Sequence, residues 1–466
     1  MDKTRYILLW TIPLLIATGC RNYLDVKPQG KVLPSTVDEY AAVMNYRLNN
    51  IESGSYDDVI GNAALVAKYE GFADDLNANI QIGNLPIYAG VQFNSNYGLY
   101  TGWYEVIKDC NIIAEAVGGM EGEEARILLA AARGMKGVCY YNLLRNYCKA
   151  YNPDTAPEDL GLCIVDHFAM DEAPARSDLE TTVRYVISVL KSSADMHVTD
   201  EKYLFTEDVV NAYLAKAYFW AERWQDALDI CENLAQKYPL ADREGFETMI
   251  MAEYDKAPGV IIRSRINDNN STSSMTYRQA VSDIRSRPLN GDLVKLYSPY
   301  NEKDIRYSLY FDSSRKNHKP PVARVREGEI FLMMAECNAH LGNTEEALNL
   351  LNRIRGQRIQ DLVPYTMETL PEVDAGATIR EDATGAPLTP LMQAILNERR
   401  MEMYLEGDRW FELKRNGSPE FWVISDQIGI YQKYTTEEYM YTFPINKDDV
   451  DLRDYIIQNE GYVEYL

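Results

Sequence analysis

Apolar side chains recur at helical spacing along much of the chain, and the clearest case is the stretch from Arg324 to Arg358. Gly342 is expected to end a first helix, and Asn343 to cap a second one with Glu346 completing a capping box. The first helix has an apolar stripe formed by Ile330, Met334, Cys337 and Leu341. The second has its apolar face at Ala347, Leu350, Leu351 and Ile354. This stretch predicts two antiparallel helices with facing apolar stripes.

One helical hairpin cannot bury both of its faces, so the same pattern is expected elsewhere in the chain. Ala335 and Ala347 lie twelve residues apart, and Ala215 and Ala227 repeat that interval within Asp208–Pro239. An alanine interval can be shared by chance, but further residues of this stretch match a tetratricopeptide repeat, namely Leu214, Tyr218, Trp224 and Pro239. We therefore predict a mainly α fold of about four tetratricopeptide-like hairpins.

Other segments with helical periodicity surround these two hairpins. Ser35 or Thr36 can cap the first of them. The expected helices are Asp38–Asn49, Trp103–Val117, Glu123–Tyr151, Leu179–Met196 and Leu391–Glu406. Two spans lose the period, Leu240–Pro321 with a strand-like run at Val260–Ile262, and Gln360–Pro390. The pattern predicts an irregular, loop-rich part mounted on helical repeats.

Composition supports a large globular core and narrows the choice of partner. Hydrophobic residues make up 46% and charged residues 25% of 466 residues, which are ordinary globular values. The formal net charge is -23. A nucleic acid or an anionic lipid surface needs a basic footprint, so this acidity argues against both as partners.

The first residues resemble an export signal. Lys3 and Arg5 precede an uncharged run, Tyr6–Ala17, that is too short to span a bilayer and ends in small residues before Cys20. A cysteine at this place resembles the lipobox of a bacterial lipoprotein, although Ala17 stands where leucine is usual. We expect residues 1–19 to be removed and Cys20 to be acylated; the alternative is an ordinary signal with a chance cysteine.

Catalytic and metal-binding motifs are missing from the sequence. The four histidines form no His-Glu-x-x-His motif, and neither a Gly-x-Ser-x-Gly elbow nor a phosphate loop occurs. Glu398 and Glu402 could in principle flank a glycosidic bond, but a structural ion-pair network is favoured. Its expected cations are Arg399, Arg400 and Arg409. We expect no catalysis, no cofactor and no essential metal, and interpret Asp268 and its neighbours at 267–271 as a solvated turn.

The other six cysteines are expected to serve as small buried hydrophobes. They form no Cys-x-x-Cys pair, and we predict no disulfide framework. They are Cys110, Cys139, Cys148, Cys163, Cys231 and Cys337.

The last third of the chain carries a familiar signature. Leu396–Met403 reads Leu-Asn-Glu-Arg-Arg-Met-Glu-Met, and Glu406–Arg415 reads Glu-Gly-Asp-Arg-Trp-Phe-Glu-Leu-Lys-Arg. Together they resemble the C-terminal signature of the SusD/RagB family of outer-membrane lipoproteins. Phe443–Ile445 and Gln458–Tyr462 are similar to the family's closing segments, with Glu460 in place of the usual proline. Near the start, Cys20, the run Tyr-Leu-Asp at 23–25, and a proline at 28 resemble the family's opening.

This resemblance implies a fold and a function. The fold is four tetratricopeptide-like hairpins carrying an irregular ligand-binding part. The function is capture of a glycan, or of a peptide, at the outside of an outer membrane and delivery to a SusC-like TonB-dependent transporter. The expected units are a signal (1–19), a lipid-anchored tether (20–34), an N-terminal helical part (35–239), a ligand-binding insertion (240–321), a hairpin (322–359) and a C-terminal part (360–466).

Aromatic and amide side chains in the irregular parts are the candidates for ligand binding. A sugar ring presents C–H faces and a rim of hydroxyl groups, which suit flat rings beside polar partners. Glu70–Tyr100 and Arg263–Tyr310 have that composition, although any of their side chains can instead be core or surface. The candidate platforms are Tyr88, Phe93, Tyr97, Tyr277, Tyr297 and Tyr300, and the polar candidates are Asn77, Asn79 and Arg278. The tryptophans of the helices are assigned to packing: Trp103, Trp220, Trp224 and Trp410.

Three functions fit these observations: a glycan-capturing lipoprotein, a peptide-capturing relative of it, and a tetratricopeptide scaffold that only binds protein.

Overall fold

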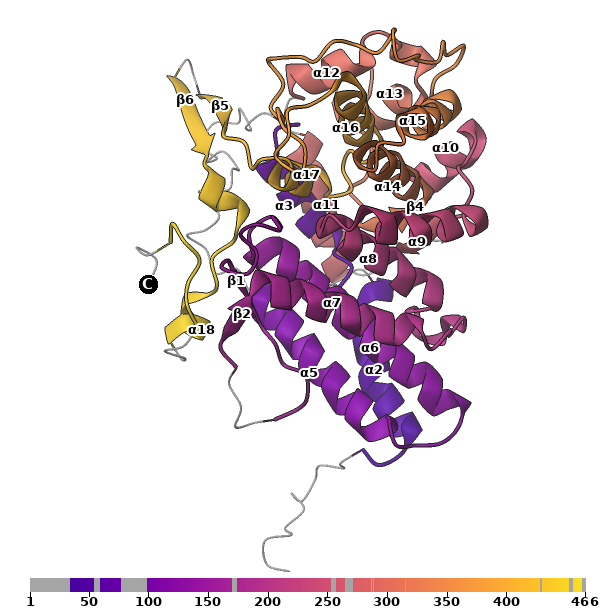
Figure 1. Ribbon diagram of the computed structural model, residues 1–466, viewed down its shortest axis with the longest axis vertical. Coiled ribbons are helices and arrows are strands. Elements are labelled where there is room, and N and C mark those ends of the chain that lie inside the picture. Colours follow the sequence, from indigo (N-terminus) through magenta and orange to yellow (C-terminus); the bar gives the residue numbers. More distant parts are fainter. Residues whose placement is uncertain are drawn as a thin grey trace, which may run out of the picture.

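The computed structural model, drawn in Figure 1, is mainly helical. It describes residues 34–53, 59–76, 99–169, 174–252, 257–264, 271–285, 287, 289–314, 316–427, 430–451 and 456–462.

A stack of antiparallel helices forms the body of the molecule, as the repeat pattern predicted. In the stack each helix packs on the next, from α5 through α6, α7, α8, α9 and α14 to α15, while α2 packs on α5. The bounds are α2 Val37–Ser53, α5 Leu99–Val117, α6 Glu123–Tyr147, α7 Leu179–Ala194, α8 Glu207–Trp220, α9 Trp224–Lys237, α14 Glu327–His340 and α15 Thr344–Arg358. Ala215, Ala227, Ala335 and Ala347 are all fully buried, so small side chains stand where these helices approach one another.

Helix ends follow local signals in some places and depart from them in others. Thr36 caps α2, because its hydroxyl accepts from the Glu39 amide while the Glu39 carboxylate accepts from the Thr36 amide. The capping box predicted at Asn343 is wrong, because the Asn343 side chain makes no capping hydrogen bond. Its amide group donates instead to Asn338 Oδ1 at 3.1 Å. The prediction that Leu341 belongs to the buried apolar stripe is also wrong. It follows the last turn of α14, where the chain leaves the core, and it is 37% exposed.

The middle of the chain is more regular than predicted. Leu240–Pro321 contains α10 Arg243–Met251, β3 Val260–Arg263, α11 Ser271–Arg285, α12 Gly291–Tyr297, the 3-10 turn η3 Asn301–Lys303 and α13 Ile305–Tyr310. Strand β3, anticipated at Val260–Ile262, pairs antiparallel with β4 Arg324–Arg326. Helix α14 therefore begins at Glu327, and the prediction of helix from Arg324 onward is wrong at its start. By contrast, residues 360–389 consist of turns and extended backbone, as expected.

These middle helices build a second hydrophobic core beside the helical stack. Phe246 of α10, Leu293 of α12 and Tyr310 of α13 meet Tyr404 and Leu405 from the signature segment. Helix α3, Ala63–Phe72, packs on both α11 and α17 (Arg409–Arg415). The signature thus lies where the stack and the second core join (Figure 1).

The C-terminal part closes on the stack. After α16 (Pro390–Glu402) and α17, a hairpin of β5 Phe421–Gln427 and β6 Ile430–Thr436 precedes the 3-10 turn η4 Glu438–Tyr441 and α18 Lys447–Asp451. The predicted closing motif acts as a clamp, in which side-chain amides form hydrogen bonds with backbone groups of other segments. Gln458 bonds both backbone groups of Ile445 at 2.8 Å, and Asn459 Nδ2 donates to Tyr147 O of α6 at 3.0 Å and to Phe443 O at 2.7 Å.

Cysteine and tryptophan side chains contribute to packing. Among the described residues the six cysteines are free thiols, and all are buried, as expected of small hydrophobes. Trp103, Trp220 and Trp410 are buried. Trp224 is half-buried and stacks on His340, with ring centroids 4.0 Å apart. A short strand pair, β1 Leu160–Cys163 and β2 Arg176–Asp178, joins α6 to α7.

Candidate functional site

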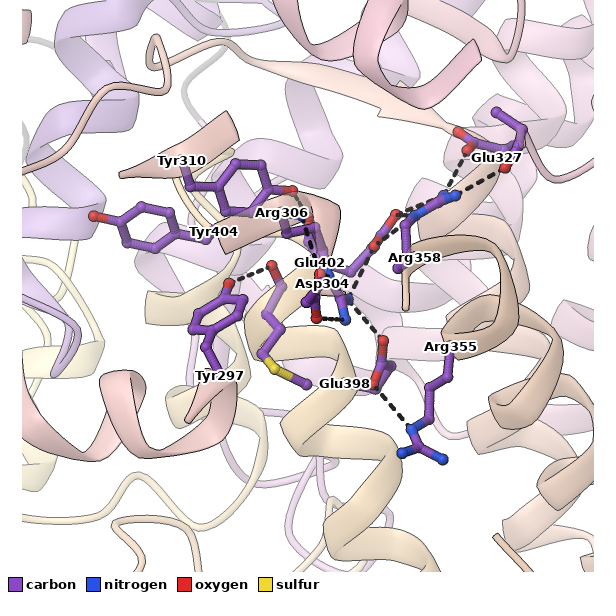
Figure 2. A network of polar contacts seen from close by, with 12 residues as sticks. Tyr297, Asp304, Arg306, Tyr310, Glu327, Arg355, Arg358, Glu398, Glu402 and Tyr404 are labelled. Atoms are coloured by element: carbon purple, nitrogen blue, oxygen red, sulfur yellow. Dashed lines mark hydrogen bonds and ion pairs between the residues drawn. The ribbon is translucent and has the colours of Figure 1, made fainter. Parts of the chain in front are cut away.

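The signature helix α16 carries a buried ionic core, shown in Figure 2. Glu402 is fully buried and receives Arg326 Nη1 at 2.8 Å, Arg358 Nη2 at 3.0 Å and Arg306 Nη1 at 3.2 Å. Burial raises the pKa of the Glu402 carboxyl, but the three guanidinium groups outweigh it and hold that pKa well below its ordinary value. Glu402 is therefore ionised and permanently paired.

The neighbouring carboxylates extend this core in two directions. Glu398 accepts from Arg306 at 2.7 Å and lies 3.8 Å from Arg355 Nε, and burial raises its pKa more than these cations lower it. Burial also raises the pKa of Glu406, but Arg324, Arg326 and Lys319 outweigh it and bring the pKa to about 2. Since Glu398 is 2% and Glu402 0% exposed, neither carboxylate is placed to contact a substrate.

A structural network was the favoured interpretation, but its predicted cations were wrong. Arg399 forms a bidentate pair with Asp408 at 2.8 Å, and Arg400 and Arg409 bind Asp74 and Asp75 at the end of α3. Neighbours on one helix point in different directions, whereas the true partners of Glu402 come from α13, β4 and α15. Local spacing could not reveal these distant arginines.

The stems of the two predicted ligand-binding regions meet, and arginines of the signature bind the first of these stems. Arg400 Nε donates to Asp75 at 2.6 Å, and Arg409 Nε donates to Asp74 at 2.7 Å. At the same point Leu76 forms a β-bridge with Leu289, and Asn290 donates to the carbonyls of Asp74 and Asp75 at 2.7 and 2.8 Å. The described end of the first region, Leu76, therefore lies beside the start of α12.

All five candidates of the first region lie outside the described residues. These are Asn77, Asn79, Tyr88, Phe93 and Tyr97. Cys20 and Asp268 lie outside them too. In the second region, Tyr277 is half-buried and Arg278 is exposed, both on α11, which packs on α3.

Tyr297 is a correction, because it offers no ring face to a ligand. It is fully buried one turn after Leu293 on the inner face of α12. Its hydroxyl donates to Met401 O at 3.0 Å, and its ring packs edge-on against Phe311. Composition could not distinguish this core tyrosine from a surface one.

Tyr300 is half-buried in a polar aromatic cluster that was not anticipated. Arg355 Nη2 donates to its hydroxyl at 2.6 Å, and the same guanidinium lies over the ring of Tyr365, 3.5 Å from its centroid. Asn352 holds Tyr365 through both backbone groups, at 2.9 and 2.8 Å. Tyr365 lies in the irregular span Gln360–Pro390. The sequence signal that could have identified it is an isolated aromatic residue among prolines. This cluster, Tyr300–Arg355–Tyr365, is the accessible aromatic part of the candidate site.

The described part of the chain contains no group of three or more His, Cys, Asp and Glu side chains arranged to hold a metal ion. None of the helices there combines the length and the apolar character needed to cross a membrane.

Comparison with known proteins decides the family. A model described as the SusD family matches residues 269–462, and a tetratricopeptide repeat model matches residues 213–241. This region of the chain, residues 269–462, belongs to the SusD family. Among curated proteins it is similar to SusD-like protein P38 of Formosa agariphila, with 33% identity over 116 residues. That match covers 24% of this chain and 21% of the relative, so it spans about a fifth of the relative's length.

Solved structures of SusD proteins share the whole fold. A SusD superfamily protein of Bacteroides thetaiotaomicron superposes with a TM-score of 0.69 at 19% identity, covering 91% of this chain and 99% of that one. A SusD-like carbohydrate binding protein of Bacteroides vulgatus gives 0.67 at 16% identity, covering 91% and 98%. At these identities the likeness establishes the architecture, a mainly helical fold with tetratricopeptide-like hairpins.

Proposed function

We propose that this SusD/RagB protein is a cell-surface lipoprotein that binds an oligosaccharide and delivers it to a SusC-like TonB-dependent transporter of the outer membrane. The family and a structural neighbour described as carbohydrate binding support the ligand class. The lipobox-like cysteine supports attachment through an acylated Cys20. The ligand is held without a cofactor or a metal, and the protein itself does not cleave it.

The arrangement of the candidate site carries this proposal. Helix α12 leads from the joined stems at Asn290 to Tyr300, so the stems and the Tyr300–Arg355–Tyr365 cluster lie at its two ends. Beside this cluster Val363 is 81% and Met367 50% exposed. The half-buried rings of Tyr300 and Tyr365, with their hydroxyl groups, suit a neutral sugar, which presents both C–H faces and hydroxyl groups. The buried Arg355 holds the two rings in place.

Calorimetry against a panel of neutral oligosaccharides and short peptides tests the ligand class. Replacing a contacting ring removes about 1–2 kcal/mol of binding, which weakens affinity about 5- to 30-fold. We expect this loss for Tyr300→Ala, and for Tyr277→Ala if the ligand reaches α11. Tyr46→Ala is the matched control, because Tyr46 is 64% exposed on α2, a helix of the stack that packs on α5.

The outcomes separate the three candidate functions. Binding of a peptide alone would support the peptide-capturing alternative, and binding of neither ligand class would favour the scaffold. Oligosaccharide binding that is equally strong in Tyr300→Ala and Tyr277→Ala would reject the site while keeping the function.

Attachment and delivery need separate tests in cells. Metabolic labelling with an alkyne analogue of palmitate should mark the wild-type chain and not Cys20→Ser. The labelled chain should be recovered from outer membranes together with the transporter. Unlabelled wild-type protein found free in the periplasm would contradict the proposal.

A further inference from the structure

Three side chains on one side of α15 lead from the candidate site into the ionic core. Asn352, Arg355 and Arg358 follow one another at intervals of three residues, which places them on neighbouring turns of the helix. Arg358 binds Glu402, and Arg355 lies 3.8 Å from Glu398 (Figure 2). Asn352 is half-buried, whereas the two arginines are buried. The inner end of this row is therefore fixed in the core, and its outer end lies at the aromatic cluster.

Asn352 ties an irregular segment of the chain to this row. Its Oδ1 accepts the Tyr365 amide at 2.9 Å, and its Nδ2 donates to the Tyr365 carbonyl at 2.8 Å, so that one side chain pairs with both backbone groups as a neighbouring strand would. In the described structure, these two bonds are what joins the backbone of residues 361–373 to other parts of the fold by hydrogen bonding. Val363 and Met367, on either side of Tyr365, are exposed. The position of Tyr365 therefore depends on Asn352.

The Asn352 side chain places the Tyr365 ring against a buried cation. The Arg355 guanidinium lies over this ring, 3.5 Å from its centroid, and donates to the Tyr300 hydroxyl at 2.6 Å. A cation over an aromatic face attracts the ring and so favours one orientation of it. The hydroxyl groups of Tyr300 and Tyr365 lie 3.5 Å apart, which fixes the spacing of the two rings. Asn352 thus holds the backbone of this arrangement, and Arg355 holds its rings.

We propose that Asn352 is a positioning residue for the ligand, because it holds Tyr365 in the orientation in which that ring meets an oligosaccharide. This inference rests on the proposed function and adds to it a residue that acts through another one. A ring that is held before binding loses little conformational freedom when the sugar arrives. Without the Asn352 amide, the sugar would have to order residues 361–373 as it binds, and the entropy lost in that ordering would weaken its affinity.

Calorimetry on the whole chain measures this role. The probes are neutral hexasaccharides of glucose, xylose and mannose, and the one that binds the wild type most tightly is then used for the variants. Asn352→Ala should weaken its binding roughly 2- to 10-fold, whereas Asn349→Ala, on the exposed side of the same helix, should leave it unchanged. In a chain that already carries Tyr365→Ala, adding Asn352→Ala should cause no further loss, because the ring that Asn352 holds is gone.

Fluorine NMR follows the Tyr365 ring without any ligand. The chain is labelled with 3-fluorotyrosine, and the Tyr365 resonance is assigned by its absence from Tyr365→Phe. Asn352→Ala should move this resonance toward the position of free 3-fluorotyrosine, because the ring leaves the Arg355 guanidinium, and Asn349→Ala should not move it. A role in overall stability alone would lower the melting temperature, followed by circular dichroism, and leave the resonance in place.

The outcomes distinguish this inference from the proposed function. A wild-type chain that binds none of the hexasaccharides would overturn both. If the wild type binds a hexasaccharide but Asn352→Ala leaves either its affinity or the Tyr365 resonance unchanged, the positioning role is overturned and the proposed function stands. An equal loss of affinity from Asn352→Ala with and without Tyr365→Ala would also overturn the role, because Asn352 would then act by another route.

Discussion

Replacement of Glu402 by glutamine tests whether the ionic core holds the molecule together. The change preserves volume but removes the charge that faces Arg306, Arg326 and Arg358, all of them fully buried. Removing one partner of a buried ion pair costs about 3–5 kcal/mol. We expect the upper end of this range, because three guanidinium groups lose one shared counter-charge at 2.8 to 3.2 Å. A loss of this size is a large part of the total stability, about 5–15 kcal/mol for a typical domain.

Urea unfolding followed by circular dichroism measures this loss, with Glu345→Gln on the exposed first turn of α15 as control. The sign of the pH dependence is also fixed. The pKa of Glu402 is lowered in the folded state, so its stabilisation is present above the ordinary value of 4.5 and is lost as pH falls toward the folded value. The difference in the free energy of unfolding between wild type and Glu402→Gln should therefore become smaller only at acidic pH. A difference below about 1 kcal/mol at pH 7 would refute the account of the core, since that is the size of an exposed pair.

Two further substitutions probe other joints of the fold, each read as a change in the free energy of unfolding. Gly161→Ala should lower the free energy of unfolding by more than about 2 kcal/mol, because a Cβ at this position collides with the Thr182 hydroxyl and the Asp178 carbonyl. Gly119→Ala is the control, since a Cβ there meets no atom within 4 Å. Equal stability of the two variants would contradict this reasoning. Asn459→Ala should cost about 2–3 kcal/mol, because it removes the Asn459 donor from the carbonyls of Phe443 and Tyr147 and the Asn459 acceptor from Arg176. The Tyr147 carbonyl keeps Arg176 as a second donor. Asn349→Ala, on the exposed side of α15, is its control, and a loss no larger than in that control would count against the clamp.

Local sequence signals predicted the helical stack well. Periodicity, small residues and the Thr36–Glu39 capping box depend on neighbours three to twelve residues apart, and such patterns can be read from one chain. Errors arose where another part of the chain determines the conformation. Arg324–Arg326 carries a helical pattern but pairs with β3 as a strand, since its strand partner lies about sixty residues away.

The candidate site was predictable only in part for the same reason. Composition identified two regions rich in aromatic residues, and the structure brings their stems together at Leu76 and Leu289. Composition could not distinguish Tyr297, which fills the core, from Tyr300, which reaches the surface. Tyr365 was missed because its neighbours Arg355 and Tyr300 come from other elements. Pairing across the fold, absent from any local pattern, decides each of these assignments.

The long sequence separations within the ionic core have a consequence for biogenesis. Arg306, Arg326 and Arg358 precede Glu402 by 96, 76 and 44 residues. A chain truncated before this glutamate would carry all three arginines without their common acceptor, and its centre could not close. The ionic core can therefore close only after synthesis of the chain has passed Glu402, late in the sequence.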